Sequence, residues 1–86
     1  MKPEAKELAE FIAKEIVGRT DTRIEEDTPL VSSGLVDSLA LVRLLGKLEQ
    51  ITRCRIPAGK VQPKDLETIT LMLATAGRVG KPRAPQ

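Results

Sequence analysis

The 86-residue sequence contains no histidine, tryptophan or tyrosine, and it has one phenylalanine and one cysteine. The lack of histidine excludes Ser-His-Asp and Cys-His catalysis and the common histidine-containing zinc sites. Because Phe11 is the single aromatic residue, the core must be built from aliphatic and methionine side chains. Cys54 alone cannot form an intramolecular disulfide, and it is consistent with a reducing compartment.

Long apolar runs are also missing. No continuous run approaches the roughly 20 residues that a membrane span needs, so we expect no membrane insertion. The N-terminus is not followed by the apolar stretch of a signal peptide, which predicts a cytoplasmic protein. Paired carboxylates could in principle catalyse a reaction, but a domain of this size offers little room for a substrate pocket. We therefore predict neither an enzyme nor a metal site.

The net charge of +2 is unevenly distributed. Residues 1–37 carry five basic and nine acidic side chains, whereas residues 38–60 carry five basic side chains against Glu49 alone. Residues 61–77 contribute −1 and residues 78–86 contribute +3. The part expected to fold is therefore close to neutral, and the basic character lies in the middle and at the end of the chain.

Hydrophobic periodicity predicts an all-α fold with three main helices and one short one. The main helices are expected at about 3–17, 37–50 and 66–76, and a short helical turn at 59–63. Pro3 and Gly18 suit the start and end of the first helix, and Asp65 or Thr68 could cap the last, which we expect Gly77 to end. No strand is predicted.

The long connection of residues 18–37 is unusual in a small domain unless it is functional or pinned to the core. The expected pins, which would hold it against the core, are apolar: Ile24, Leu30, Val31, Leu35 and Val36. At the other end of the chain, residues 78–86 are expected to be a disordered basic, proline-containing tail. The domain itself is predicted to cover residues 1–77.

Ser38 follows Asp37 at the predicted start of the second helix, and three roles are open to it. As a nucleophile it would need a base; histidine is absent, and adjacent residues at a helix start rarely face each other, although a lysine base remains open. As a helix cap it would be ordinary, because Asp and Ser are preferred at that position. As an attachment point it would hold a phosphate ester at the positive end of a helix.

The residues around Ser38 favour attachment. Residues 28–39, Thr-Pro-Leu-Val-Ser-Ser-Gly-Leu-Val-Asp-Ser-Leu, resemble the motif of the acyl carrier protein family. The similarity continues through the second helix, where Leu48-Glu49 matches the end of the family pattern. It also includes the Ile56-Pro57 step and residues 61–69. It covers about residues 5–77 in the order and spacing of the family.

This resemblance implies a four-helix bundle with a short third helix. It implies that Ser38 carries 4′-phosphopantetheine, transferred from coenzyme A by a phosphopantetheinyl transferase, and that Asp37 supports the transfer. An acyl or aminoacyl group would be held as a thioester by the arm. A ligase would load it, and a downstream acyltransferase or synthase would receive it. Leu39 and Val42 would contact these partners; core packing is their alternative role.

Some residues depart from the family pattern. Carriers of fatty acid synthesis are usually strongly acidic along the second helix, whereas this helix carries Arg43 and Lys47. Because charge complementarity sets partner choice, we expect dedicated partners that contact these two cations, with solvated surface as the alternative. The spacing of the Asp-Ser motif is similar to that of D-alanyl, aminoacyl and other specialised carriers, so a specialised biosynthetic pathway is expected.

Other interpretations remain. The chain could be a freestanding carrier or a domain cut from a synthase. It could also be an unmodified interaction scaffold with the carrier fold, or a small helical nucleic-acid-binding protein, although aromatic residues for base stacking are missing. Gly46, inside the second helix, could allow a helix to approach closely or could widen a cleft.

Overall fold

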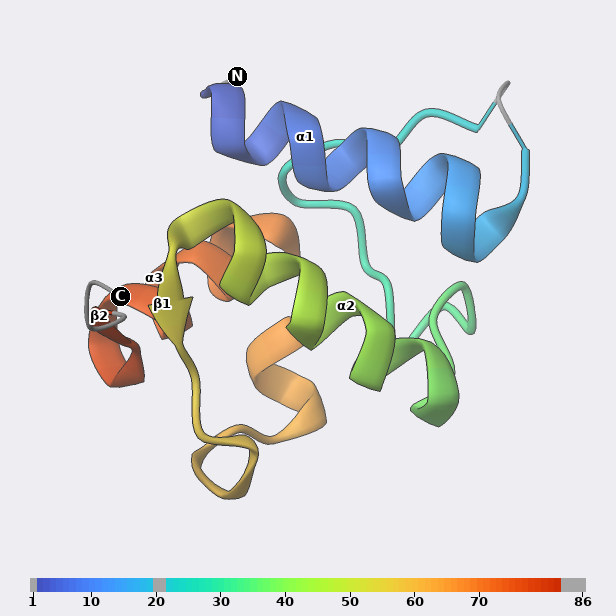
Figure 1. The fold of residues 1–86 in the computed structure, drawn as a ribbon. Coiled ribbons are helices and arrows are strands. Elements are labelled where there is room, and N and C mark those ends of the chain that lie inside the picture. The colour runs from blue at the N-terminus through green and yellow to red at the C-terminus, as the bar shows by residue number, and fades with distance from the viewer. Residues whose placement is uncertain (1, 20–21, 83–86) are drawn as a thin grey trace.

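A computed structural model describes residues 2–19 and 22–82 of the chain. The fold is mostly helical with very little strand (Figure 1), which confirms the predicted all-α class. The elements in chain order are α1 (Pro3–Phe11), η1 (Ile12–Val17), α2 (Ser38–Thr52), β1 (Cys54–Arg55), η2 (Ala58–Lys60), η3 (Pro63–Leu66), α3 (Ile69–Val79) and β2 (Lys81–Pro82). In place of the single short helix predicted at 59–63, the chain forms the two 3₁₀ turns η2 and η3, on either side of residues 61–62.

The first helix has the predicted limits but an unexpected second half. Pro3 stands in its first turn, and Gly18 ends it in the left-handed conformation with φ 79°. The segment η1 is a π-helix, in which the Gly18 N–H donates to the Ala13 carbonyl oxygen at 2.9 Å. Periodicity alone does not distinguish this wider turn from an α-helix, because both keep Ile12 on the buried face.

Helix α2 is two residues longer than predicted. The Thr52 hydroxyl donates to the Leu48 carbonyl oxygen at 2.7 Å, and the chain leaves the helix at Arg53, which has a positive φ of 56°. No glycine or proline marks this end, so the sequence contained no strong stop signal. Leu44 and Leu48 are fully buried and fix the inner face of the helix.

The end of the chain corrects two predictions. Helix α3 begins at Ile69, after Thr68 caps it by accepting a hydrogen bond from the Leu71 N–H at 3.1 Å. It does not end at Gly77 but continues to Val79, because a glycine is tolerated within a helix where tertiary contacts hold the flanking residues.

Residues 78–82 of the predicted tail are therefore ordered. After α3 the chain turns at Gly80, and β2 pairs antiparallel with β1, with Cys54 opposite Pro82 and Arg55 opposite Lys81. A side chain at Gly80 would collide with the Ala76 carbonyl oxygen and approach the Cys54 Cβ to 3.0 Å. Pairs of two-residue strands leave almost no alternation in the sequence, which explains why no strand was predicted. Residues 83–86 lie outside the described residues.

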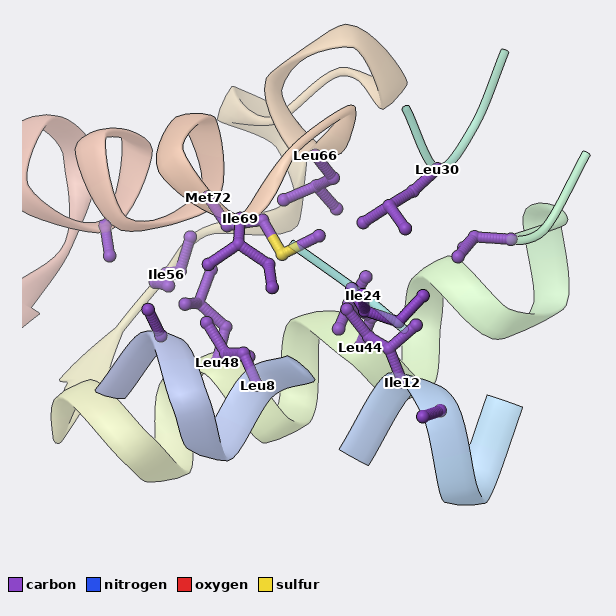
Figure 2. Close-up of a cluster of buried hydrophobic side chains, with 14 residues drawn as sticks. Leu8, Ile12, Ile24, Leu30, Leu44, Leu48, Ile56, Leu66, Ile69 and Met72 are labelled. Carbon is purple, nitrogen blue, oxygen red and sulfur yellow. The ribbon is translucent and has the colours of Figure 1, made fainter. Parts of the chain in front are cut away.

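The core fills the space between α1, α2, α3 and the connection that precedes α2 (Figure 2). Three of the expected pins of that connection, Ile24, Leu30 and Val36, are buried in it, while Val31 and Leu35 are half-buried. The remaining members are aliphatic residues and one methionine: Ala5, Leu8, Ile12, Ala13, Leu44, Leu48, Ile56, Leu66, Ile69, Met72 and Ala76. Among the described residues, no helix has the length and apolarity to cross a membrane.

Candidate functional site

Asp37, and not Ser38, takes the capping role, which is one of the three roles that the sequence left open for Ser38. Asp37 is the N-cap of α2: its backbone is extended, and its Oδ1 accepts a hydrogen bond from the Ala40 N–H at 2.8 Å. Ser38 is the first helical residue and is exposed. Its hydroxyl forms no hydrogen bond within residues 2–19 and 22–82. The cap is thus Asp37, and the Ser38 hydroxyl is accessible for reaction.

The start of α2 suits a phosphate on that hydroxyl. Ala40 donates to Asp37, but the N–H groups of Ser38 and Leu39 have no acceptor in the described part of the chain. The first N–H groups of a helix and its dipole favour an anion, and α2 is a full 15 residues long. The residues present therefore fit a phosphate ester at Ser38.

A tight turn delivers the chain to this helix start. Gly34 has a φ of 83°, in the left-handed region that glycine adopts without strain. The Ser33 hydroxyl donates to the Pro29 carbonyl oxygen at 2.6 Å, and the Val36 N–H donates to the Leu30 carbonyl oxygen at 3.0 Å. These bonds close the turn directly before Asp37.

Glu67, which the sequence analysis did not single out, anchors this turn from the other side of the core. Its Oε1 accepts hydrogen bonds from the N–H groups of Leu30 and Val31, both at 2.8 Å, and of Ser32 at 3.1 Å. The hydrogen bond from Ser32, above all, and those from Val31 and Leu30 hold the pKa of Glu67 below its ordinary value, against a smaller opposing effect of burial. No motif of adjacent residues could have indicated this contact, because the partners are 35 to 37 residues apart.

Leu39 and Val42 are exposed, which removes core packing as their role. The exposed fractions are 81% for Leu39 and 72% for Val42, although both are large apolar side chains. Val42 also borders a shallow hollow of about 200 Å³ between α2 and residues 58–66, lined mainly by Leu41, Leu45, Ala58, Val61 and Leu66. An apolar surface therefore begins one residue after Ser38, as expected for a surface that partner proteins contact.

Arg43 and Lys47 contact α1 and η1. The Arg43 guanidinium donates to the Glu15 carbonyl oxygen at 3.0 Å, and the Lys47 ammonium lies 3.6 Å from the Glu7 carboxylate. Both cations lie over the Phe11 ring, at 6.0 and 5.6 Å from its centroid. The side chain of Lys47 is only 24% exposed, so these two residues join two helices of the bundle in addition to any contact with a partner.

Gly46 is not required for a close approach between helices. A Cβ built at this position meets nothing within 4 Å, and the residue is exposed. The close approach of another helix, one of the two roles considered for it from the sequence, is therefore excluded. In the described part of the chain, no group of three or more acidic, cysteine or histidine side chains could hold a metal ion.

Comparison with known proteins agrees with this geometry. The family model for the phosphopantetheine attachment site matches residues 7–73, from α1 into α3. No curated protein and no solved structure matches the chain. Members of the matched family carry 4′-phosphopantetheine covalently and work with a phosphopantetheinyl transferase and synthetic enzymes. Because the match spans most of the chain and the fold is all-α, this protein belongs to the acyl carrier protein family of phosphopantetheine-bearing carriers.

Proposed function

We propose that Ser38 is the residue to which 4′-phosphopantetheine is attached and that the protein is a non-catalytic carrier. The observation that supports this most directly is the division of roles at the start of α2. Asp37 satisfies the Ala40 N–H, and the Ser38 hydroxyl is left exposed and without a hydrogen bond in the described residues. When attached, the arm supplies a terminal thiol that holds an acyl or aminoacyl group as a thioester.

The residues next to Ser38 would hold the helix start in position and contact the partner enzymes. Asp37 keeps the helix start in place and offers its second carboxylate oxygen to the transferase and its magnesium ion. Leu39 and Val42 provide the apolar contact for the transferase and for the enzymes that load and unload the arm. We further propose a specialised pathway with dedicated partners, because α2 lacks the acidic surface that general fatty acid carriers present and instead carries two cations.

Intact mass spectrometry tests the attachment. The purified full chain is incubated with coenzyme A, magnesium and a broad-specificity phosphopantetheinyl transferase, beside the variants Ser38→Ala and Ser32→Ala. Ser32 is an exposed serine in the same loop, and its alanine variant keeps the main-chain N–H that donates to Glu67, so this variant is the matched control. We expect one phosphopantetheine on the wild type and on Ser32→Ala and none on Ser38→Ala. If several transferases leave the wild type unmodified, the chain is an unmodified scaffold instead.

The role of Asp37 can be separated from its capping function. Asn caps helices about as well as Asp, so Asp37→Asn retains the hydrogen bond to Ala40 while removing the charge. We expect Asp37→Asn to fold with wild-type thermal stability and to be modified more slowly. Asp37→Ala should lose about 1 kcal/mol of stability as well. Equal modification rates for Asp37→Asn and the wild type would limit Asp37 to the role of a cap.

A further inference from the structure

Three exposed cations gather where α2 and α3 end. Arg53 terminates α2, Arg55 lies in β1 and Lys81 in β2, and all three side chains are exposed. Figure 1 places the β1–β2 pair at the end of α2 that is distant from Ser38. None of the three cations forms an ion pair or hydrogen bond with its side chain within residues 2–19 and 22–82. Among the other arginines, Arg23, Arg43 and Arg78 each pair with a carboxylate.

The fold brings two of these charges together against electrostatic repulsion. Arg55 and Lys81 are directly opposite each other in the antiparallel pair, and like charges at such positions are destabilising. Their close approach depends on Gly80, where any side chain would collide with Ala76 and crowd Cys54. The negative C-terminal ends of α2 and α3 offset part of the repulsion. The three charged side chains remain exposed to solvent.

We propose that Arg53, Arg55 and Lys81 form a docking surface for an acidic segment of a partner protein. Two or three carboxylates spaced along an extended or helical segment would neutralise the cluster and relieve the repulsion between Arg55 and Lys81. Helix α2 is 15 residues long, so this surface lies about 22 Å from Ser38. It is therefore distinct from the Leu39–Val42 surface, and it does not depend on modification of Ser38.

The size and chemistry of the cluster favour a protein over other polyanions. Nucleic-acid-binding proteins commonly contact about 6–10 phosphates, and polybasic lipid-binding segments carry about 4–8 cations. The cluster has three, and it offers no aromatic side chain on which bases could stack. The single aromatic residue, Phe11, lies under Arg43 and Lys47 in the α1–α2 contact instead. An acidic polypeptide needs neither an aromatic platform nor a longer basic surface.

NMR titration tests the surface directly. The ¹⁵N-labelled full chain is titrated with a short synthetic Asp/Glu peptide at low and at physiological salt. The test variant is Arg55→Gln/Lys81→Gln. The matched control is Lys6→Gln/Lys14→Gln, which removes two exposed lysines from the first helix. It has the same net charge as the test variant. We expect shifts of the amide signals of residues 53–55 and 80–81, and a Kd about tenfold weaker in the test variant only.

Thermal unfolding of the same variants adds a second criterion. Because the substitutions remove a repulsion, the Tm of Arg55→Gln/Lys81→Gln should equal or exceed that of the wild type. A lower Tm would show that the two cations hold the strands together, and would overturn the proposal. Equal weakening of binding in both double variants, or the absence of binding, would also overturn it.

Two further probes decide the class of partner. Random duplex DNA and vesicles containing anionic lipid are tested in the same titration. If DNA or the vesicles bind more strongly than the Asp/Glu peptide, and the test variant loses this binding, the partner is that polyanion and not an acidic protein. The docking proposal and the carrier function can fail independently. The titration measures peptide binding, whereas modification of Ser38 is measured separately by intact mass. We expect the test variant to be modified as fast as the wild type.

Discussion

The N–H of Leu30 donates to Glu67 twice, to the side-chain Oε1 at 2.8 Å and to the main-chain carbonyl oxygen at 2.9 Å. The two residues are separated by 37 positions in the chain, yet this contact fixes the beginning of the turn that leads to Ser38. The position of the candidate attachment site therefore depends on a residue that directly precedes the cap of α3.

Glu67→Gln should loosen this turn. The neutral amide accepts hydrogen bonds more weakly than the carboxylate, so the N–H groups of Val31 and Ser32 should exchange with solvent faster and the Tm should fall at pH 7. Hydrogen exchange by NMR measures the first effect and thermal unfolding the second. Glu4→Gln, at an exposed glutamate, is the control. Unchanged exchange at Val31 and Ser32 would contradict the anchoring role.

The same contact predicts a pH dependence. The pKa of Glu67 lies below its ordinary value of 4.5 in the folded protein, so the unfolded chain binds the proton more readily. The stabilisation is fully present above pH 4.5 and is lost as the pH falls through the lower, folded pKa. The difference in Tm between the wild type and Glu67→Gln should therefore narrow below pH 4.5. A constant difference down to pH 3 would refute this linkage.

Alanine should have opposite effects at Gly46 and Gly34. Both positions have open space for a Cβ, so the backbone conformation decides the sign. Gly46 lies inside α2, where alanine should stabilise the protein by about 0.8–1 kcal/mol. Gly34 has a φ of 83°, where an L-residue costs about 1–2 kcal/mol. Urea unfolding of both variants provides the test, and the same sign for both would contradict it.

Leu39→Ala and Val42→Ala should affect partners but not folding. Both side chains are mainly exposed, so each change should alter the stability by less than about 0.5 kcal/mol. Modification by the transferase should slow by about five- to tenfold if these side chains anchor the contact. Leu71→Ala is the control, because Leu71 is an exposed leucine on α3. Equal rates for all three variants would leave Leu39 and Val42 without a role in recognition.

Phe11 and Lys47 should be coupled energetically. The ammonium lies 5.6 Å from the ring centroid and is only partly exposed, which predicts a coupling of about 0.5–1 kcal/mol. A double-mutant cycle with Phe11→Leu and Lys47→Met measures it, because both substitutions keep most of the apolar volume. A charge reversal at Arg43 or Lys47 would change the α1–α2 contact as well as any contact with a partner. The measured coupling shows how large the first effect is.

Helix positions and the start of the site could be predicted from local sequence. The limits of the first helix were read from Pro3 and Gly18, and the position of Asp37 and Ser38 from the motif around them. Each of these features depends on residues within one or two turns of each other, where capping preferences and glycine conformation dominate. Ile24, Leu30 and Val36 were found for a related reason, since apolar residues in a long polar connection have few other places to go.

The features that the sequence did not indicate depend on tertiary contacts. Glu67 accepts hydrogen bonds from N–H groups of a distant turn, β1 pairs with β2 from beyond α3, and Arg43 and Lys47 contact Phe11 across two helices. The π-helix η1 was not predicted either, because the sequence pattern on its buried face is compatible with either helix type.

Because α2 is long, different partners could contact its two ends at the same time. Ser38 is at one end, and the docking surface that we propose is at the other. A partner bound at Arg53, Arg55 and Lys81 would not need to release the carrier when the arm moves from one enzyme to the next. Such tethering raises the effective concentration of the arm near that partner to the millimolar range typical of short linkers, so that successive transfers become intramolecular events.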